Sequence, residues 1–189
     1  MILPKVRDPR LVTIRRGGLL TDPDHHLLAL WAAACAEHVL DLFEAECPSD
    51  LRPRHAIAGA RAWAAGELAM MQSRAAGGHA MGAARPLSGA ARFAAYAAGQ
   101  AACIPHVPEH DLGAAAYAIK AAQAAAAAGD DGEDAARREC QWQLDQLPDP
   151  IRALVLDDQA RRNPICWSVF TEPGPLAAGP THPSGGLQR

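Results

Sequence analysis

Apolar residues recur at helical spacing along most of the chain, and this pattern predicts six or seven α-helices. Trp31 and Phe43 share the apolar face of a first helix, which Thr21 or Asp22 can cap and which runs to about Cys47. The further helices are expected over about 51–76, from 79 to before Pro86, over 88–103, from 108 to 129, from about 130 to 147, and from Asp149-Pro150 onward. A Gly77-Gly78 pair is expected to end the second of them.

The 189 residues are enough for one domain with short flanking segments. Residues 1–20 predict a short extended N-terminal arm with a turn at Gly17-Gly18. Residues 21–170 carry the helical pattern, whereas residues 171–189 are rich in proline and glycine and predict a disordered C-terminal tail. The expected fold class is therefore all-α, an irregular helical bundle with these two flanking segments.

An alanine-rich stretch, residues 79–120, is predicted to form the tightly packed hub of this bundle. Alanine is the best helix former, and helices faced with alanine and glycine can approach one another closely. Because alanine buries little apolar area, the few large side chains of the core carry much of the packing. We expect Trp31 and Trp63 to lie in the core, on the inner faces of the first two helices.

Charge and composition exclude several kinds of partner. A net charge of −3 and a pI near 6.2 give no long-range attraction to nucleic acid or to an anionic membrane. The sequence also has no uninterrupted apolar stretch of about 18 residues and no signal-peptide pattern, so the protein is expected in the cytoplasm. Five cysteines without a CxxC pair indicate neither a disulfide framework nor a thiolate zinc site.

The segment His106-Val107-Pro108-Glu109-His110 matches the letters HxxEH, in which two histidines bind zinc and the glutamate activates water. That chemistry needs one continuous helix, and Pro105 and Pro108 predict that a turn interrupts it. The favoured interpretation is that Glu109 belongs to the first turn of the next helix and that His110 and Asp111 bond neighbouring backbone. We therefore expect no metal and no other cofactor, and no catalytic residue is assigned.

A candidate pocket for a ligand or partner can nevertheless be drawn around the hub. Trp63, Glu67 and Arg74 share one face of the second predicted helix, and Tyr117 lies seven residues after His110 on the same helical face. The proposed lining is Trp63, Glu67, Arg74, His79, His106, Glu109, His110 and Tyr117. The alternative is an ordinary core seam in which Glu67 bonds Arg74 or a neighbouring helix. The doublets Arg137-Arg138 and Arg161-Arg162 are interpreted as solvated helix surface.

Several co-linear segments resemble one known family. They are LVTIRRGG from Leu11, TDPDHHLLALWAAACAEHVLDLFE from Thr21, ARAWAAGE from Ala60, HVPEHDLGAAAYAIKA from His106 and RRNPICWSVF from Arg161. Together they are similar to the immunity-five-like family of immunity proteins, which is linked to bacterial polymorphic toxins. The similarity extends over roughly residues 11–170.

This resemblance implies an all-α cytoplasmic protein that binds and neutralises a cognate protein toxin. It implies no catalytic residue. The alternative from the residues themselves is a small-molecule-binding protein or enzyme that uses a histidine-lined pocket in the alanine-rich hub.

Overall fold

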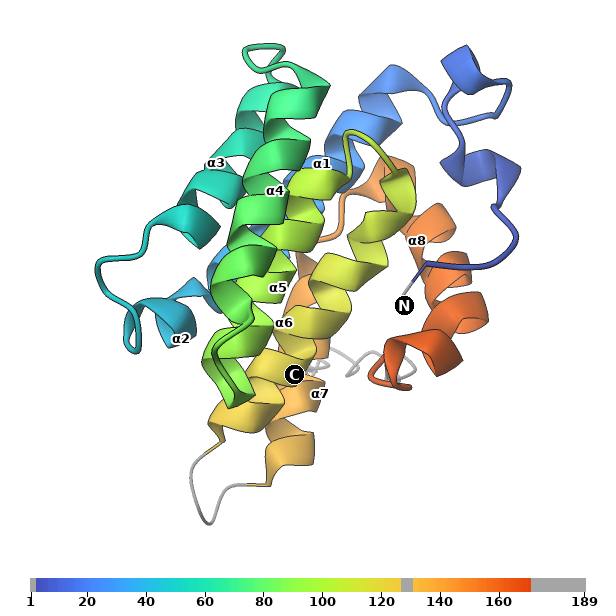
Figure 1. Ribbon diagram of the computed structural model, residues 1–189. Helices are drawn as coiled ribbons and strands as arrows, with labels where there is room; N and C mark the ends of the chain where they lie inside the picture. Colours follow the sequence, from blue (N-terminus) through green and yellow to red (C-terminus); the bar gives the residue numbers. More distant parts are fainter. Residues whose placement is uncertain (1–2, 127–130, 171–189) are drawn as a thin grey trace, which may run out of the picture.

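Helix α5 (Gly89–Cys103) forms the centre of a helical bundle. It contacts five other helices, namely α1 (Asp22–His38), α2 (Leu40–Glu44), α3 (Arg52–Ala64), α4 (Met70–Ala84) and α6 (Asp111–Ala125). Two more helices, α7 (Gly132–Asp145) and α8 (Asp149–Arg162), pack on the far side of α1 and α6 (Figure 1). Nearly every alanine of α5 is buried, because only a helix with small side chains on all sides can be surrounded so closely.

This computed structural model describes residues 3–126 and 131–170. Over these residues the chain is all-α, as predicted, with eight α-helices rather than six or seven. The additional helix arises at Val39, whose backbone leaves the helical conformation, so that the first predicted helix is divided into α1 and α2. The redirected α2 then buries Leu40 and Phe43 against α5.

The second helix was predicted over residues 51–76, and the predicted end was wrong. Helix α3 ends at Ala64, and Gly66 adopts the left-handed conformation, with φ of 77°. Helix α4 then begins at Met70 and continues through Gly77-Gly78 to Ala84, so His79 lies within a helix and does not begin one. Gly66 therefore acts as the helix terminator that the sequence assigned to Gly77-Gly78.

Gly77 remains helical because α4 and α5 approach each other closely at that point. A Cβ atom on Gly77 would lie 2.7 Å from the carbonyl oxygen of Gly99 on α5 and 2.9 Å from Cys103 Sγ. Nearby, the Ser73 hydroxyl donates a hydrogen bond of 2.9 Å to the carbonyl of Ala102. Packing between the two helices thus outweighs the intrinsic helix penalty of glycine, about 1 kcal/mol.

The two adjacent glycines of α4 are expected to respond to alanine with opposite signs. Gly77→Ala forces α4 and α5 apart and should lower the free energy of unfolding by about 1–3 kcal/mol. Gly78→Ala, whose Cβ would meet nothing within 4 Å, should raise it by about 0.5–1 kcal/mol through helix propensity. Urea unfolding of both variants measures this, and equal shifts would contradict the close approach of the helices.

The N-terminal arm packs on the bundle, and it is less extended than predicted. It forms two short 3-10 turns, η1 (Pro9–Leu11) and η2 (Ile14–Arg16), and Gly17 makes the expected turn with φ of 80°. Thr13 and Leu20 form an isolated bridge. Leu11 and Leu20 are buried in the same core as the helices. In Figure 1 the blue arm lies beside the start of α1 and beside α8, to which Asp8 and Arg10 form ion pairs.

The predicted tail, residues 171–189, lies outside the described residues. Within the described ranges, no helix has both the length and the apolar character needed to cross a membrane.

Candidate functional site

Four aromatic side chains from three parts of the chain form a continuous cluster that reaches the surface. Phe93 and Tyr96 come from α5, Tyr117 from α6, and Trp167 from the segment that follows α8. The ring centroid of Tyr117 lies 5.1 Å from Tyr96, 5.0 Å from Trp167 and 6.2 Å from Phe93. We call these four residues the aromatic surface.

The segment around Trp167 holds its side chain outward. A 3-10 turn, η4 (Asn163–Cys166), ends at Trp167, whose φ of 59° is in the left-handed region that non-glycine residues rarely adopt. Asn163 fixes the segment from both sides, because its amide donates to the carbonyl of Phe170 at 2.8 Å and its side-chain oxygen accepts from the Phe170 amide at 3.0 Å. Trp167 stays 47% exposed, whereas Cys166 and Phe170 are buried.

Two cations border the aromatic surface. The Arg92 guanidinium lies 5.5 Å from the ring centroid of Tyr96, and Lys120 Nζ lies 6.0 Å from that of Phe93. Within the described residues, neither Arg92 nor Lys120 forms an ion pair. The aromatic surface is therefore bordered by two positive charges without an ion pair in the described residues, although the whole chain carries a net charge of −3.

A hollow of ≈ 370 Å³ adjoins Trp167, between α6, α7 and the segment after η4. Its lining is Lys120, Gln123, Glu133, Ala136, Arg137, Trp167, Ser168 and Val169. Trp167 is exposed, and Tyr96, Tyr117 and Arg92 are half-buried. Tryptophan, tyrosine and arginine are the residue types enriched in the energetically dominant part of protein–protein interfaces.

A second cavity, of ≈ 300 Å³, lies between the N-terminal arm and the bundle. We call it the N-terminal cavity. It is lined by Arg7, Thr13, Arg15, Arg16, Asp22, His25, His26, Trp63, Met70, Pro105, His106 and Pro108.

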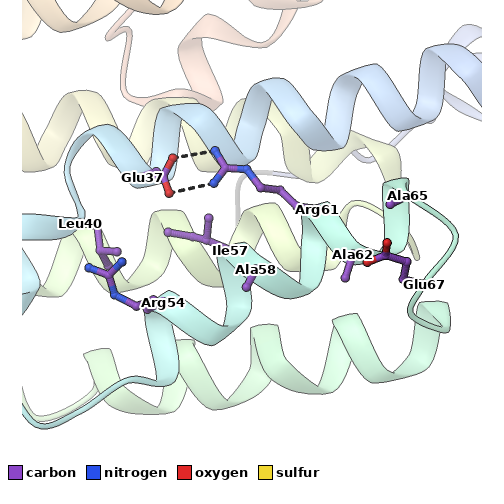
Figure 2. A pocket seen from close by; sticks show the side chains of 9 residues that line it. All are labelled: Glu37, Leu40, Arg54, Ile57, Ala58, Arg61, Ala62, Ala65 and Glu67. Atoms are coloured by element: carbon purple, nitrogen blue, oxygen red, sulfur yellow. Dashed lines mark hydrogen bonds and ion pairs between the residues drawn. The ribbon is translucent and has the colours of Figure 1, made fainter.

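A third concavity, of ≈ 420 Å³, is an open groove along α3 that faces α1 and α2 (Figure 2). Its apolar lining includes Ile57 and Leu40. Three of its four charged lining residues are paired. Arg61 forms two hydrogen bonds with the carboxylate of Glu37, at 2.8 and 2.6 Å, as Figure 2 shows. Arg54 likewise pairs with Glu44. Glu67 is then the one charged lining residue of the groove without an ion pair in the described part of the chain.

The eight residues predicted to share one pocket are distributed over several places. Trp63 and His106 line the N-terminal cavity, Glu67 lines the α3 groove, and Tyr117 belongs to the aromatic surface. Trp63 is only partly buried, in contrast to the core position expected for it. The structure thus brings Trp63 and His106 together and separates both from Tyr117.

Arg74 and His79, two more of the eight, are exposed side chains of α4 and line none of the three concavities. The alternative expectation, an ion pair between Glu67 and Arg74, does not occur within the described residues. The exposure of Arg74 and His79 and the lack of a Glu67–Arg74 pair both follow from the break at Gly66. This break places Glu67 in a loop and starts α4 in a new direction.

Glu109 and His110, the last two, are held by partners within the protein. Glu109 is buried and accepts two hydrogen bonds from the guanidinium of Arg7, at 2.7 and 2.6 Å. His110 bonds a side chain rather than backbone, because its Nδ1 donates to the Gln100 amide oxygen at 2.7 Å. Burial lowers the pKa of His110 to about 4, so the ring is neutral at pH 7.

The HxxEH segment has the interruption that its two prolines predicted. His106 lies in a turn after α5, and Glu109 and His110 lie in the short 3-10 turn η3 (Pro108–His110), so no single helix carries both histidines. Among the described residues, no group of three or more histidine, cysteine, aspartate or glutamate side chains is placed to hold a metal ion.

The prediction missed Arg92, Trp167 and two histidines of the N-terminal cavity, His25 and His26. Arg92 and Tyr96 are one helical turn apart on α5, and this spacing was a usable signal for their cation–aromatic pair. The pair of Lys120 with Phe93 joins two helices, so local spacing could not indicate it. Trp167 had no such signal, because its outward orientation depends on the contact between Asn163 and Phe170.

These features define an all-α protein with a cationic aromatic surface, and comparison with known families makes the assignment more specific. A family model described as "Imm-5 like putative immunity protein" matches residues 18–150, well over half of the chain. The chain therefore belongs to this immunity-five-like family. Searches of curated proteins and of solved structures each found no match.

Proposed function

We propose that this protein acts as an immunity protein that binds a cognate protein toxin in the cytoplasm and neutralises it. The observation that carries the proposal is the family match over residues 18–150. An immunity protein needs no reaction of its own, because occupying the toxin's functional surface is sufficient. The fold alone does not determine which protein is bound, because the side chains at the docking surface define the partner.

The aromatic surface is the docking site that we assign to the toxin. Tryptophan and tyrosine supply large contact areas at low entropic cost, and Trp167 stands beside a hollow that can accept an apolar side chain of the partner. Arg92 and Lys120, whose charges have no ion-pair partner in the described part of the chain, favour acidic side chains opposite them. The expected partner surface is therefore an apolar anchor flanked by aspartate or glutamate.

The candidate toxin to test first is the product of the gene beside the one that encodes this chain. Its expression in a host should arrest growth, and co-expression of the wild-type chain should restore it. Failure of the wild-type chain to bind and protect against that protein, and against any toxic protein that it captures from the native cytoplasm, would contradict the immunity function itself.

Two variants test the docking surface separately from the function. Trp167→Ala is expected to weaken toxin binding by about 30-fold or more, the effect of losing a residue that contributes at least about 2 kcal/mol. Met71→Ala, which truncates an exposed apolar side chain on α4, should leave the affinity unchanged. Calorimetric titration measures both. Wild-type affinity in Trp167→Ala would remove the aromatic surface from the proposal while the immunity function stood.

A second function class, a small-molecule-binding protein or enzyme, is favoured by one observation. The N-terminal cavity joins Trp63 and His106 of the predicted pocket with two further histidines, His25 and His26. A gene neighbourhood of biosynthetic enzymes without a toxin gene would favour this class over the first.

A further inference from the structure

The N-terminal cavity is built from segments that are far apart in the sequence. The arm contributes Arg7 and two arginines of η2, the first turns of α1 contribute histidines, α3 contributes Trp63, and the turn after α5 contributes His106. At ≈ 300 Å³ the cavity is at the small end of the range for ligand pockets, about 300–1,000 Å³. It can hold a molecule with one ring or a short chain.

The charges that line the cavity do not cancel. Arg7 is neutralised by the buried carboxylate of Glu109, 2.6 Å away, and Arg15 by Asp22, 2.7 Å away. Arg16 forms no ion pair with any residue in the described ranges. The cavity is therefore left with one uncompensated guanidinium, the group that best matches a carboxylate or a phosphate.

Two histidines that line the cavity, His25 and His106, have lowered pKa values, which favours their neutral form. His25 is buried, and its Nε2 donates to the Ile104 carbonyl at 2.8 Å; desolvation lowers its pKa. The pKa of His106 is lowered by desolvation first and then by the positive charges of Arg74, Arg16 and Arg7. Arg16 and His106 both line the cavity, and the unpaired guanidinium of Arg16 gives the cavity a positive potential.

Trp63 supplies an apolar surface next to these polar groups. The rings of His25 and His26 both pack against the Trp63 ring in T-shaped contacts, with centroid distances of 4.7 and 4.8 Å. Trp63 is only partly buried and also lines the cavity, as does Met70. A ligand that carries its charge at one end could place an apolar part against these two side chains.

We propose that the N-terminal cavity binds a small-molecule oxyanion, a carboxylate or a phosphate, with Arg16 as its charge partner and Trp63 and Met70 as its apolar wall. This site is separate from the aromatic surface, and its occupancy does not depend on toxin binding.

Three probes test the proposal and distinguish the two oxyanion chemistries: benzoate, acetate and inorganic phosphate. They are titrated calorimetrically into the full chain at one fixed ionic strength set with chloride. We expect saturable binding of at least one probe, with one site per chain. Binding of benzoate above acetate identifies a carboxylate ligand that uses the apolar wall, and preferential binding of phosphate identifies a phosphate ligand. Absence of saturable binding by all three overturns the proposal.

Arg16→Gln is expected to lower the affinity for the probe at least tenfold. Arg85→Gln is the matched control, because Arg85 is likewise exposed and without an ion pair in the described part of the chain. It lies just beyond the C-terminal end of α4, some 20 Å from Met70 at the other end, by the helical rise of about 1.5 Å per residue. Equal affinities in wild type and Arg16→Gln overturn the proposal, and so does an equal loss in both variants, which would indicate non-specific screening.

A spectroscopic measurement places the ligand in this cavity. The pKa of His106 is lowered by desolvation and, after it, by positive charges that include Arg16. Arg16→Gln should therefore raise that pKa in the free protein, and a bound oxyanion should raise it in the wild type. Side-chain NMR titration of His106 records both shifts. A probe that binds without moving the His106 titration occupies another site and overturns the assignment. Circular dichroism should show the same helix content in all three proteins, because Arg16 is exposed.

Discussion

Replacing Arg162 by methionine is expected to lower the free energy of unfolding by about 3–5 kcal/mol. The Arg162 side chain is only 4% exposed and pairs with Asp111 and Asp158, which are also buried. It further donates a hydrogen bond of 2.8 Å to the Glu109 carbonyl, and so joins α8 to η3 and to the start of α6. Without it, Asp111 would remain buried with no counterion among the described residues, and Asp158 would keep only its contact with Arg161 at 3.2 Å; this costs more than the lost contacts.

The neighbouring arginine provides the control for this experiment. Arg161 contacts Asp8, Asp157 and Asp158, but its side chain is 43% exposed. Arg161→Met should therefore cost no more than about 1 kcal/mol. Urea unfolding at pH 7 distinguishes the two positions, and a similar loss in both variants would show that burial of Arg162 is not what makes it important.

The reason for the Arg162 effect can be tested by removing the whole charged group. Burial raises the pKa of Asp111, while the charge of Arg162 opposes that shift. In the triple variant Arg162→Met, Asp111→Asn and Asp158→Asn no uncompensated charge remains, so most of the lost stability should return. A triple variant as unstable as Arg162→Met alone would show that packing of the arginine side chain, and not its charge, stabilises this region.

Trp31→Ala is expected to lower the free energy of unfolding by about 3–5 kcal/mol, through the cavity that it leaves in the core. Trp31 is 2% exposed, and its indole Nε1 donates a hydrogen bond of 2.9 Å to the carbonyl of Gln143. The side chain thereby connects α1 with α7. Trp31→Phe should cost less than alanine, about 1–3 kcal/mol, because most of the packing is kept and the carbonyl loses its donor.

Chemical unfolding monitored by circular dichroism measures both substitutions of Trp31. Trp167→Ala is the comparison, since Trp167 is 47% exposed and should cost no more than about 1 kcal/mol in stability. A loss below about 1 kcal/mol for Trp31→Ala would mean that α1 and α7 do not depend on this contact.

The position of Trp63 shows how far helical periodicity can place a side chain. The same pattern predicted that Trp31 and Trp63 are both buried, and it was correct for Trp31. Periodicity identifies the face of a helix on which a residue lies, but it does not determine what covers that face. The last turn of α3 is covered by the arm and by the turn after α5, which leave the N-terminal cavity beside Trp63.

The sequence by itself determined the fold class, most helix starts and the family. Thr21 caps α1 and Asp131 caps α7 through their side chains, as their residue types predict, because a cap is a local interaction between a side chain and the next turn of backbone. Pro105 and Pro108 likewise separated His106 from the next helix, because proline lacks the amide hydrogen that a helix needs.

Only the tertiary structure decided between residues that are locally equivalent. Gly66 ends a helix while Gly77 lies within one, because α5 packs against Gly77. Arg162 is buried while Arg161 is exposed, although the doublet was interpreted as solvated surface, because α8 turns Arg162 toward Asp111 and the core. These outcomes depend on contacts between residues far apart in the chain, and local propensity and periodicity contain no information about such contacts.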